Sequence, residues 1–327
     1  MAEHLDDLLR DFSAGSKRAV ARLISIVEDQ RADAHTVLDR LYPRIGRARR
    51  IGITGPPGAG KSTLVDQLVM RAVRLDRRVG IVAVDPTSPF TGGALLGDRI
   101  RLGDAANDPR VFFRSLASRG SLGGLSLHTA EVVDVLDASG CDEVLIETVG
   151  VGQSELDIAE KAHTTVVVLV PESGDGVQVM KAGLMEIADV FVVNKADRSG
   201  AAQMVAELNG ALDFREVDGW RPPVLQTQAR DGGGVEELAA ALDAHTAWLE
   251  HSGRRAAKLS RAMESRVRDL VQDRLVRETF ETPAAQALFA AGLAAIAQGA
   301  STPYRLAEKI LDANRRTIAA AWSGSKG

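Results

Sequence analysis

Residues 55–63 combine glycines, a lysine and a serine in an order that suits phosphate binding. They read Gly55-Pro56-Pro57-Gly58-Ala59-Gly60-Lys61-Ser62-Thr63. Glycine lets successive backbone N–H groups curl around phosphate oxygens, and the start of a helix adds a favourable dipole. In such a loop the lysine reaches the β- and γ-phosphates, and the serine hydroxyl ligates Mg²⁺. We therefore expect a nucleotide phosphate site here, with Lys61 as a catalytic residue and Ser62 as a metal ligand.

A second motif, Asn194-Lys195-Ala196-Asp197, indicates which base is bound. The carboxylate of Asp197 can accept hydrogen bonds from both the ring N–H and the exocyclic amine of guanine, whereas adenine presents no such pair of donors. Taken alone, the four residues could also be a helix N-cap beside a solvated lysine. Following a phosphate-binding loop, they predict that Asn194, Lys195 and Asp197 bind guanine, and that the nucleotide is GTP or GDP.

Three carboxylates between the two motifs are candidate catalytic and metal-side residues. Asp85 and Glu147 each end an apolar run, and Asp98 lies beside Arg99 in a glycine-rich stretch. Because the carboxyl ends of parallel strands face the ligand crevice, Asp85 and Glu147 can approach Mg²⁺ directly or through water. Asp85 could instead cap a turn, and Asp98 with Arg99 could be a solvated ion pair.

Two loops are predicted to respond to the γ-phosphate. Residues 92–99 are expected to form a first switch loop, ordered by the γ-phosphate and Mg²⁺. Gly150 can donate its N–H to the γ-phosphate, so that loss of this contact on hydrolysis would release residues 151–155 as a second switch. Gln153 is either a water-orienting residue or a loop glutamine bonded to the backbone, and the sequence favours neither.

The surrounding pattern predicts the elements that position these residues. Short apolar runs rich in β-branched residues alternate with amphipathic stretches, which is typical of an α/β protein with a mainly parallel sheet. A helix over residues 235–250 is expected to complete this arrangement. The apolar runs are residues 51–54, 79–84, 110–113, 142–147, 165–171, 189–194 and 223–226.

Helical patterns flank the α/β region on both sides. They predict three domains, namely an N-terminal helical extension, a GTP-binding domain and a C-terminal helical region for dimerisation or partner binding, over residues 1–45, 46–252 and 253–327. Gly253 is expected to begin a polar, arginine-rich hinge, and Pro303 to open the last helix. The apolar stretch 284–300 suits a dimer interface, but it could equally pack on the N-terminal helices.

Composition narrows the class of protein. The 327 residues carry a net charge of −4, with 45% hydrophobic and only 4% aromatic residues. These values suit a soluble globular protein and disfavour an aromatic platform for nucleic acid. The single Cys141 excludes a disulfide framework, no apolar leader opens the sequence, and no run approaches the roughly 20 apolar residues of a membrane span. We expect a cytoplasmic protein with neither nucleic acid nor membrane as a partner.

These motifs together closely resemble those of the MeaB/ArgK family of GTPases. The resemblance covers residues 10–250 approximately, and its most specific part is Glu147-Thr148-Val149-Gly150-Val151-Gly152-Gln153-Ser154-Glu155. It implies the P-loop NTPase fold of the SIMIBI class of GTPases, which includes the signal-recognition-particle and MinD-like proteins. It also implies a homodimeric G-protein chaperone of an adenosylcobalamin-dependent acyl-CoA mutase, typically methylmalonyl-CoA mutase. Such chaperones use GTP binding and hydrolysis to gate cofactor loading and to protect the mutase.

The resemblance further implies a third switch loop within residues 172–181. Asp175, Gln178 and Lys181 fit its pattern. Two glycines make this a mobile turn, and Lys181 could carry partner or nucleotide-state information across a dimer. Without the family, the same residues would be read as a helix N-terminus capped by Asp175.

Three departures from the family pattern stand out. Arg99 replaces a lysine found in many relatives, Ala182 replaces a second basic residue, and Thr227-Gln228-Ala229 replaces the commoner Ser-Ala guanine loop. Arg99 keeps the charge, and the loss at Ala182 bears on partner signalling. By the family pattern, Gln228 and Ala229 belong to the nucleotide site, where the backbone N–H of Ala229 can bind guanine O6.

Two other functions stay open on the sequence. A nickel-insertion metallochaperone GTPase would need clustered cysteine or histidine ligands near the switch loops, which Cys141, His128 and His163 do not supply. We expect those histidines on helix surfaces or at caps. A small-molecule kinase is opposed by the guanine motif. Because the sequence offers no clear arginine finger, hydrolysis is expected to be slow alone and to be accelerated by the mutase.

Overall fold

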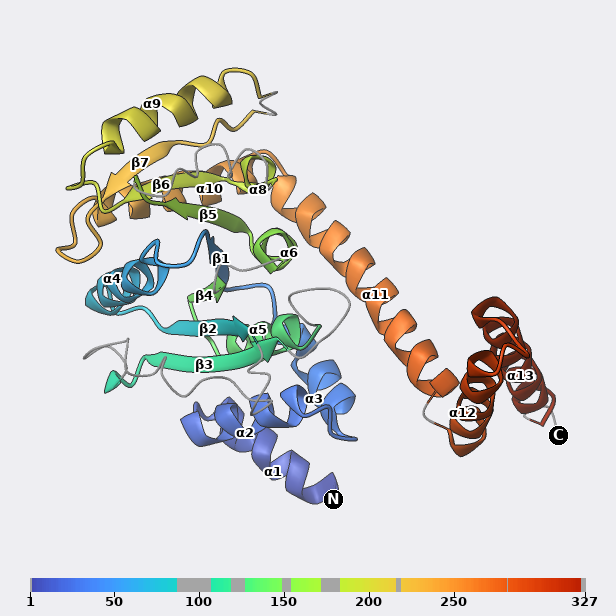
Figure 1. Ribbon diagram of the computed structural model, residues 1–327. Helices are drawn as coiled ribbons and strands as arrows, with labels where there is room; N and C mark the ends of the chain where they lie inside the picture. The colour runs from blue at the N-terminus through green and yellow to red at the C-terminus, as the bar shows by residue number, and fades with distance from the viewer. Residues whose placement is uncertain are drawn as a thin grey trace. The chain divides into compact units, whose positions relative to one another are not determined.

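A parallel β-sheet is the centre of the protein. The computed structural model describes residues 2–86, 107–118, 127–148, 154–171, 183–215, 219–280 and 282–324. The chain divides into two compact units, residues 1–262 and 263–327. Within the described residues, seven strands of the first unit form one sheet in the order β3-β2-β4-β1-β5-β6-β7 (Figure 1).

Every strand of this sheet runs parallel to its neighbours. The α/β fold class that the sequence predicts is therefore confirmed, and each predicted apolar run coincides with a strand, apart from small differences at the ends. Such strands are buried on both faces, which explains their nearly continuous Val, Ile and Leu content. The strands are β1 Arg49–Thr54, β2 Val79–Pro86, β3 Val111–Ser118, β4 Glu143–Thr148, β5 Thr164–Leu169, β6 Val190–Asn194 and β7 Val224–Thr227.

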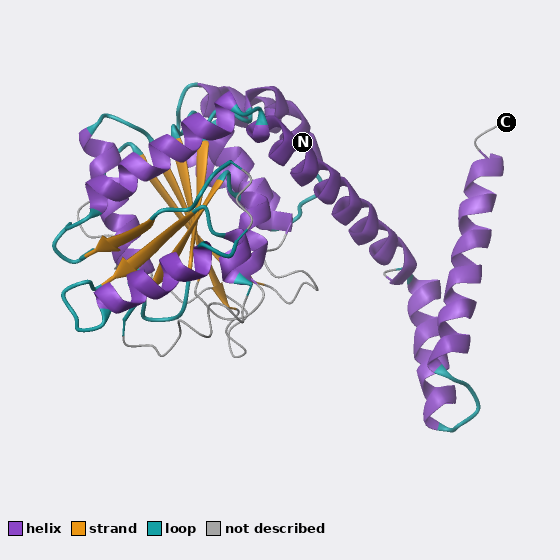
Figure 2. Ribbon diagram, turned by 90° about the horizontal axis from the view of Figure 1, so that it is seen from above, coloured by secondary structure: helices purple, strands orange, loops and turns teal. Residues whose placement is uncertain are grey.

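Helices cover both faces of the sheet (Figure 2). On one face α4 (Lys61–Arg74) and α10 (Val235–His251) share a buried apolar cluster with β1. The other face carries α5 (Leu127–Ala138), α6 (Ser154–Lys161), α8 (Leu184–Ile187) and α9 (Ala201–Leu212). Successive side chains of a strand point to opposite faces. Ile53 accordingly packs in the α4 cluster, whereas a Cβ at Gly52 would meet Ile158 of α6 at 2.7 Å.

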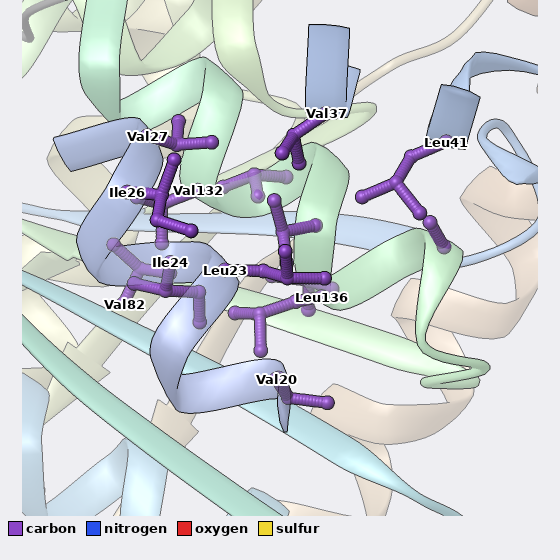
Figure 3. Packing of buried hydrophobic residues seen from close by; sticks show 14 of the residues in the cluster. Val20, Leu23, Ile24, Ile26, Val27, Val37, Leu41, Val82, Val132 and Leu136 are labelled. Carbon is purple, nitrogen blue, oxygen red and sulfur yellow. The ribbon is translucent and has the colours of Figure 1, made fainter. Parts of the chain in front are cut away.

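The N-terminal helices pack against α5. They are α1 (Ala2–Ser13), α2 (Lys17–Glu28) and α3 (Ala34–Leu41), followed by the short 3₁₀ turn η1 (Tyr42–Arg44). Side chains such as Leu23 and Ile24 of α2 lie in one cluster with Val132 and Leu136 of α5 (Figure 3). Ser16 begins α2 as an N-cap, since its side chain accepts a hydrogen bond from the Ala19 N–H. The predicted N-terminal helices thus share a core with the sheet.

The C-terminal part of the chain is helical, as the sequence predicts. It contains α11 (Arg254–Phe280), α12 (Pro283–Ala297) and α13 (Pro303–Gly324). In the second unit a Cβ at Gly292 would overlap the side chain of Leu306, so this glycine allows α12 and α13 to approach closely. Within the described ranges no single helix is long and apolar enough to cross a membrane, and α11 and α12 meet that test only as a pair.

The break predicted at Gly253 lies between two helices. Only Ser252 and Gly253 separate α10 from α11, and the arginine-rich segment that follows is already helical. Gly253 has φ +70°, the left-handed conformation with which many helices end. Because Arg, Ala, Lys and Leu all favour helices, α11 begins directly after this break.

Strand order places a crevice at the carboxyl edge of β1. The chain leaves β1 through α4 to β2 on one side, and it later crosses from β4 through α6 to β5 on the other side. Ligands of open α/β sheets bind outside the carboxyl ends of the strands at such a switch point. The segments after β1, β4, β6 and β7, in which the sequence predicts site residues, all start from this edge.

Candidate functional site

The loop between β1 and α4 has the conformation of a phosphate cradle. Gly55, Gly58 and Gly60 all have positive φ angles, of +137°, +75° and +87°. A Cβ at Gly55 would overlap the carbonyl oxygen of Val168 in the adjacent strand. Glycine is therefore required by backbone shape and by close approach. The first turn of α4 follows directly, and the start of a helix is a favourable place for a phosphate group.

Lys61, the first residue of α4, keeps its ammonium group inside this loop. Its Nζ donates to the carbonyl oxygens of Gly55 at 2.7 Å and of Pro56 at 2.9 Å, and the residue is only 5% exposed. The charge is thus already held where the loop curls. This position agrees with the predicted role of Lys61 toward the β- and γ-phosphates.

Ser62 and Glu147 meet at the mouth of the loop. The Ser62 Oγ donates a hydrogen bond of 2.6 Å to the Glu147 Oε1. Ser62 lies in the first turn of α4 and Glu147 near the end of β4, so two elements far apart in sequence supply one pair of oxygen donors. Hydroxyl and carboxylate oxygens are the ligands that Mg²⁺ prefers, and the pair therefore fits the predicted metal.

Strand β2, which carries Asp85, ends near the same edge. Asp85 lies in this strand one residue after Val84, which is in register with Thr148 of β4. Its backbone is therefore beside the strand end that carries Glu147, and its side chain lies outside the described residues. Several further predicted residues also lie outside them, namely Asp98, Arg99, Gly150, Gln153, Asp175, Gln178, Lys181 and Ala182.

Asn194 joins three segments of the nucleotide edge. Its Nδ2 donates to the Ala59 carbonyl of the phosphate loop at 2.8 Å. Its Oδ1 accepts from the Thr227 hydroxyl and from the Ala229 N–H, both at 3.0 Å. A Cβ at Gly60 would overlap this amide nitrogen. Asn194 is 3% exposed, so that one buried amide holds the phosphate loop and the two guanine-motif segments in register.

A cavity of about 470 Å³ opens between these segments. Its size suits a nucleoside-sized ligand. Its lining includes the predicted base-contacting residues Asn194, Lys195, Asp197, Gln228 and Ala229, and also Gly60, Thr63, Arg198, Arg230 and Asp231. The last three charged residues were not predicted as site residues. Their only signal in the sequence is adjacency to Asp197 and Ala229.

His163 differs from its expectation. It lies between α6 and β5, and its Nδ1 accepts a hydrogen bond of 3.2 Å from the Arg50 N–H, so it is not a helix-surface residue. Burial, followed by the nearby charges of Arg50, Arg255 and Lys258, lowers the pKa of His163 to about 3. The ring is thus held neutral by its surroundings. Burial also raises the pKa of the Cys141 thiol, which lies in the apolar cluster under α5.

Among the described residues, no group of three or more His, Cys, Asp or Glu side chains is placed to hold a metal ion. The side chains of Asp85 and Asp98 lie outside those residues.

Comparisons with known proteins agree with this geometry. Residues 20–284 match the family model described as methylmalonyl Co-A mutase-associated GTPase MeaB. A Pyrococcus horikoshii protein that carries a GTPase name is 51% identical over 271 residues, covering 82% of this chain and 86% of the relative. The GTPase ArgK of Escherichia coli is 37% identical over 260 residues, with 76% and 78% covered. The crystal structure of a LAO/AO transport system kinase aligns with a TM-score of 0.71 and 26% identity, over 95% of this chain and 97% of the other.

The parallel sheet, the phosphate loop after β1 and these relatives define a P-loop GTPase of the SIMIBI class. Within that class the family model covers most of the chain. The protein belongs to the MeaB family of GTPases.

Proposed function

We propose that this GTPase is a Mg²⁺-dependent chaperone of an adenosylcobalamin-dependent acyl-CoA mutase such as methylmalonyl-CoA mutase. In this role GTP binding and hydrolysis gate cofactor loading and protect or reactivate the mutase. The observation that carries the proposal is the match to the mutase-associated family model over residues 20–284. The extended motif after β4 supports it, because that segment starts directly from Glu147, which already contacts the phosphate-loop serine.

The residues at the carboxyl edge suit hydrolysis by positioning and charge. Lys61 and the loop amides would hold the β- and γ-phosphates, while Ser62 and Glu147, together with Asp85 and Asp98, would hold Mg²⁺. When bound, Mg²⁺ neutralises charge that develops on the phosphate oxygens. Asp197 would select guanine at the other end of the cavity, where the Ala229 N–H is already donated to the Asn194 Oδ1.

We also propose that the protein acts as a homodimer through its C-terminal helices. None of the residues of α11 is buried within the chain, and four of its apolar side chains, Met263, Val267, Val271 and Leu275, follow one another at every fourth position. Val267, Val271 and Leu275 are 59%, 52% and 49% exposed. The family resemblance implies that a second copy of this chain covers these exposed side chains.

Steady-state hydrolysis tests the chaperone role. The purified protein would be assayed with GTP and Mg²⁺, alone and with each adenosylcobalamin mutase from its source genome. We expect slow hydrolysis alone and an increase of about tenfold or more with one mutase, because the sequence offers no clear arginine finger and that partner would complete the site. Lys61→Ala serves as the inactive control. An unchanged rate with a demonstrably bound mutase would contradict the proposal, and an acceptor-dependent phosphorylated product would favour a kinase.

A further inference from the structure

Two buried threonines are bonded to each other beside the proposed metal site. Thr54 ends β1 and Thr148 ends β4, and the two strands are in register one residue earlier, at Ile53 and Glu147. The Thr148 Oγ1 donates a hydrogen bond of 2.9 Å to the Thr54 Oγ1. Both residues are 0% exposed, so this bond is shielded from water.

The threonine pair lies on the opposite face of the sheet from Glu147. Ile146 packs in the same cluster as Ile158 of α6, whereas Leu145 packs in the cluster of α4. Because side chains alternate along a strand, Thr148 points with Ile146 and Glu147 points toward α4. The hydrogen bond between Ser62 and Glu147 and the hydrogen bond between Thr148 and Thr54 thus hold the end of β4 from opposite faces of the sheet.

Both hydrogen bonds connect β4 to the phosphate-loop segment. Thr54 directly precedes Gly55, the first residue of the loop, and Ser62 lies just beyond its end. With a hydrogen bond on each face, the end of β4 resists rotation about its own axis, which is the motion that would carry the Glu147 carboxylate away from Ser62.

Packing alone does not explain two hydroxyls at these positions. The two positions in register beside the pair, Val84 of β2 and Val167 of β5, are both buried valines. A valine would fill nearly the same space without a polar atom, and a buried hydroxyl is costly unless it is hydrogen-bonded. The pair therefore supplies a directional link between β1 and β4 that apolar side chains could not supply.

We propose that Thr148, held by Thr54, is a positioning residue that fixes Glu147 for Mg²⁺-dependent GTP hydrolysis. This inference rests on the proposed function, specifically on the metal role of Ser62 and Glu147. Thr148 itself touches neither nucleotide nor metal in this account. It acts through the backbone of the residue that precedes it.

Three substitutions test the inference. Thr148→Val removes the hydroxyl, Thr148→Ser retains it, and Thr165→Val is the matched control. Thr165 is a 0% exposed β5 residue in register with Gly52, and its Oγ1 has no hydrogen-bond partner in the described part of the chain. Each variant would be assayed for kcat and KM with GTP. Calorimetry would measure how much Mg²⁺ strengthens GDP binding relative to EDTA, a readout independent of turnover.

For Thr148→Val we expect kcat to fall about tenfold with KM changed less than about twofold, since the contact matters for alignment rather than for uniform binding. The gain in GDP affinity from Mg²⁺ should fall by about threefold or more, because the Glu147 carboxylate would be held less firmly. Thr148→Ser and Thr165→Val should each stay within about twofold of the unchanged protein.

The outcomes separate this inference from the proposed function. Wild-type kcat and Mg²⁺ response in Thr148→Val, or an equal loss in Thr165→Val, would overturn the positioning role. If circular dichroism shows Thr148→Val unfolded, Thr54→Val removes the same bond from the other side and carries the same expectation. A loss of kcat in Thr148→Val without a loss in Glu147→Gln would also overturn the positioning role, because Thr148 could then not act through Glu147. The proposal that the protein hydrolyses GTP would still stand. Failure of the unchanged protein to hydrolyse GTP would instead overturn the proposed function. The effect of Mg²⁺ on GDP binding, measured by calorimetry, would still test the role of Thr148.

Discussion

Asn194 shows how one buried side chain can organise a nucleotide site. Its amide connects the phosphate loop at Ala59 to the guanine segment at Thr227 and Ala229. The guanine motif is usually considered for its contacts with the base. In this chain the first residue of the motif has three contacts within the protein itself, so it also sets the distance between the two ends of the cavity.

Asn194→Ala should therefore reduce both stability and nucleotide binding. The substitution leaves the Ala229 N–H and the Ala59 carbonyl without their bonds to Asn194, so we expect the free energy of unfolding to fall by about 1–3 kcal/mol. GDP affinity should fall about tenfold or more as the cavity loses its register. Chemical denaturation and calorimetry measure the two effects. Asn209→Ala on α9, where the amide donates to the Val205 carbonyl one turn earlier, is the control and should change neither strongly.

Asp197→Asn should change which base is preferred. The asparagine amide offers a donor where the carboxylate accepted from the guanine amine, and xanthine carries an oxygen at that position. We expect GTP affinity to fall roughly 100-fold and xanthosine triphosphate to become the better ligand. Asp231→Asn is a matched control, because it removes a second carboxylate from the same cavity wall. A switch of preference in Asp231→Asn alone would show that the wrong carboxylate was assigned to the base.

At the scale of elements, the amino edge of the sheet is fastened by polar contacts around the first turns of α11. Lys258 donates to the His163 carbonyl at 2.9 Å, and Arg255 donates to the Gly46 carbonyl at 3.1 Å. Arg50, 8% exposed, pairs with Asp134 and Asp137 of α5 at 2.8 Å each. This edge lies at the opposite ends of the strands from the cavity. Substitutions here should therefore change stability rather than nucleotide binding.

Stability should fall in mild acid because of His163. Its pKa is about 3 in the folded chain, against an ordinary 6.5. Between these values the unfolded chain binds a proton that the folded chain does not, so stability decreases as pH falls below 6.5, by up to about 1.4 kcal/mol per pH unit for one proton. Unfolding followed from pH 7 to pH 4 should show a shallower acid loss in His163→Asn. The exposed His35→Asn is the control, and an identical loss in both variants would contradict this cause.

The strands and the break at Gly253 could both be predicted from the sequence. Fully buried parallel strands have a distinct apolar composition, and the glycine loop and the Asn-Lys-x-Asp motif mark their carboxyl ends. Gly253 marks the break after α10, because glycine readily adopts the left-handed conformation with which many helices end. The Thr54–Thr148 bond and the Asn194 contacts depend on strand order and register, which a single sequence does not reveal.

At the scale of the whole molecule, the chain combines a nucleotide-binding unit with a separate helical unit. Among the side chains described in the second unit, Leu306 and Ile310 are buried, at 4% and 6% exposed. The sequence predicted its helices and its apolar composition. It could not tell whether the apolar stretch 284–300 faces another copy or the same chain, because both arrangements bury the same small side chains.

If the protein dimerises through α11, introducing charges on this helix should prevent self-association. Val271→Asp combined with Leu275→Asp places two carboxylates on the exposed apolar face of α11, where a dimer would bury them unpaired. Sedimentation should shift from dimer to monomer, while GTP affinity stays within about twofold because the cavity is unchanged. Gln272→Asp, on the same helix, is the control and should leave the dimer intact. A double variant that stays dimeric would place the interface elsewhere.

Control of mutase binding by nucleotide state is measured most directly as the affinity of the complex in two nucleotide states. Calorimetry would titrate the candidate mutase with the protein loaded with Mg²⁺ and either GDP or a non-hydrolysable GTP analogue. A nucleotide can bias the partner only through a difference in affinity between the two states. We expect dissociation constants that differ by about tenfold or more, or about 1.4 kcal/mol. Equal affinities in both states would contradict this control.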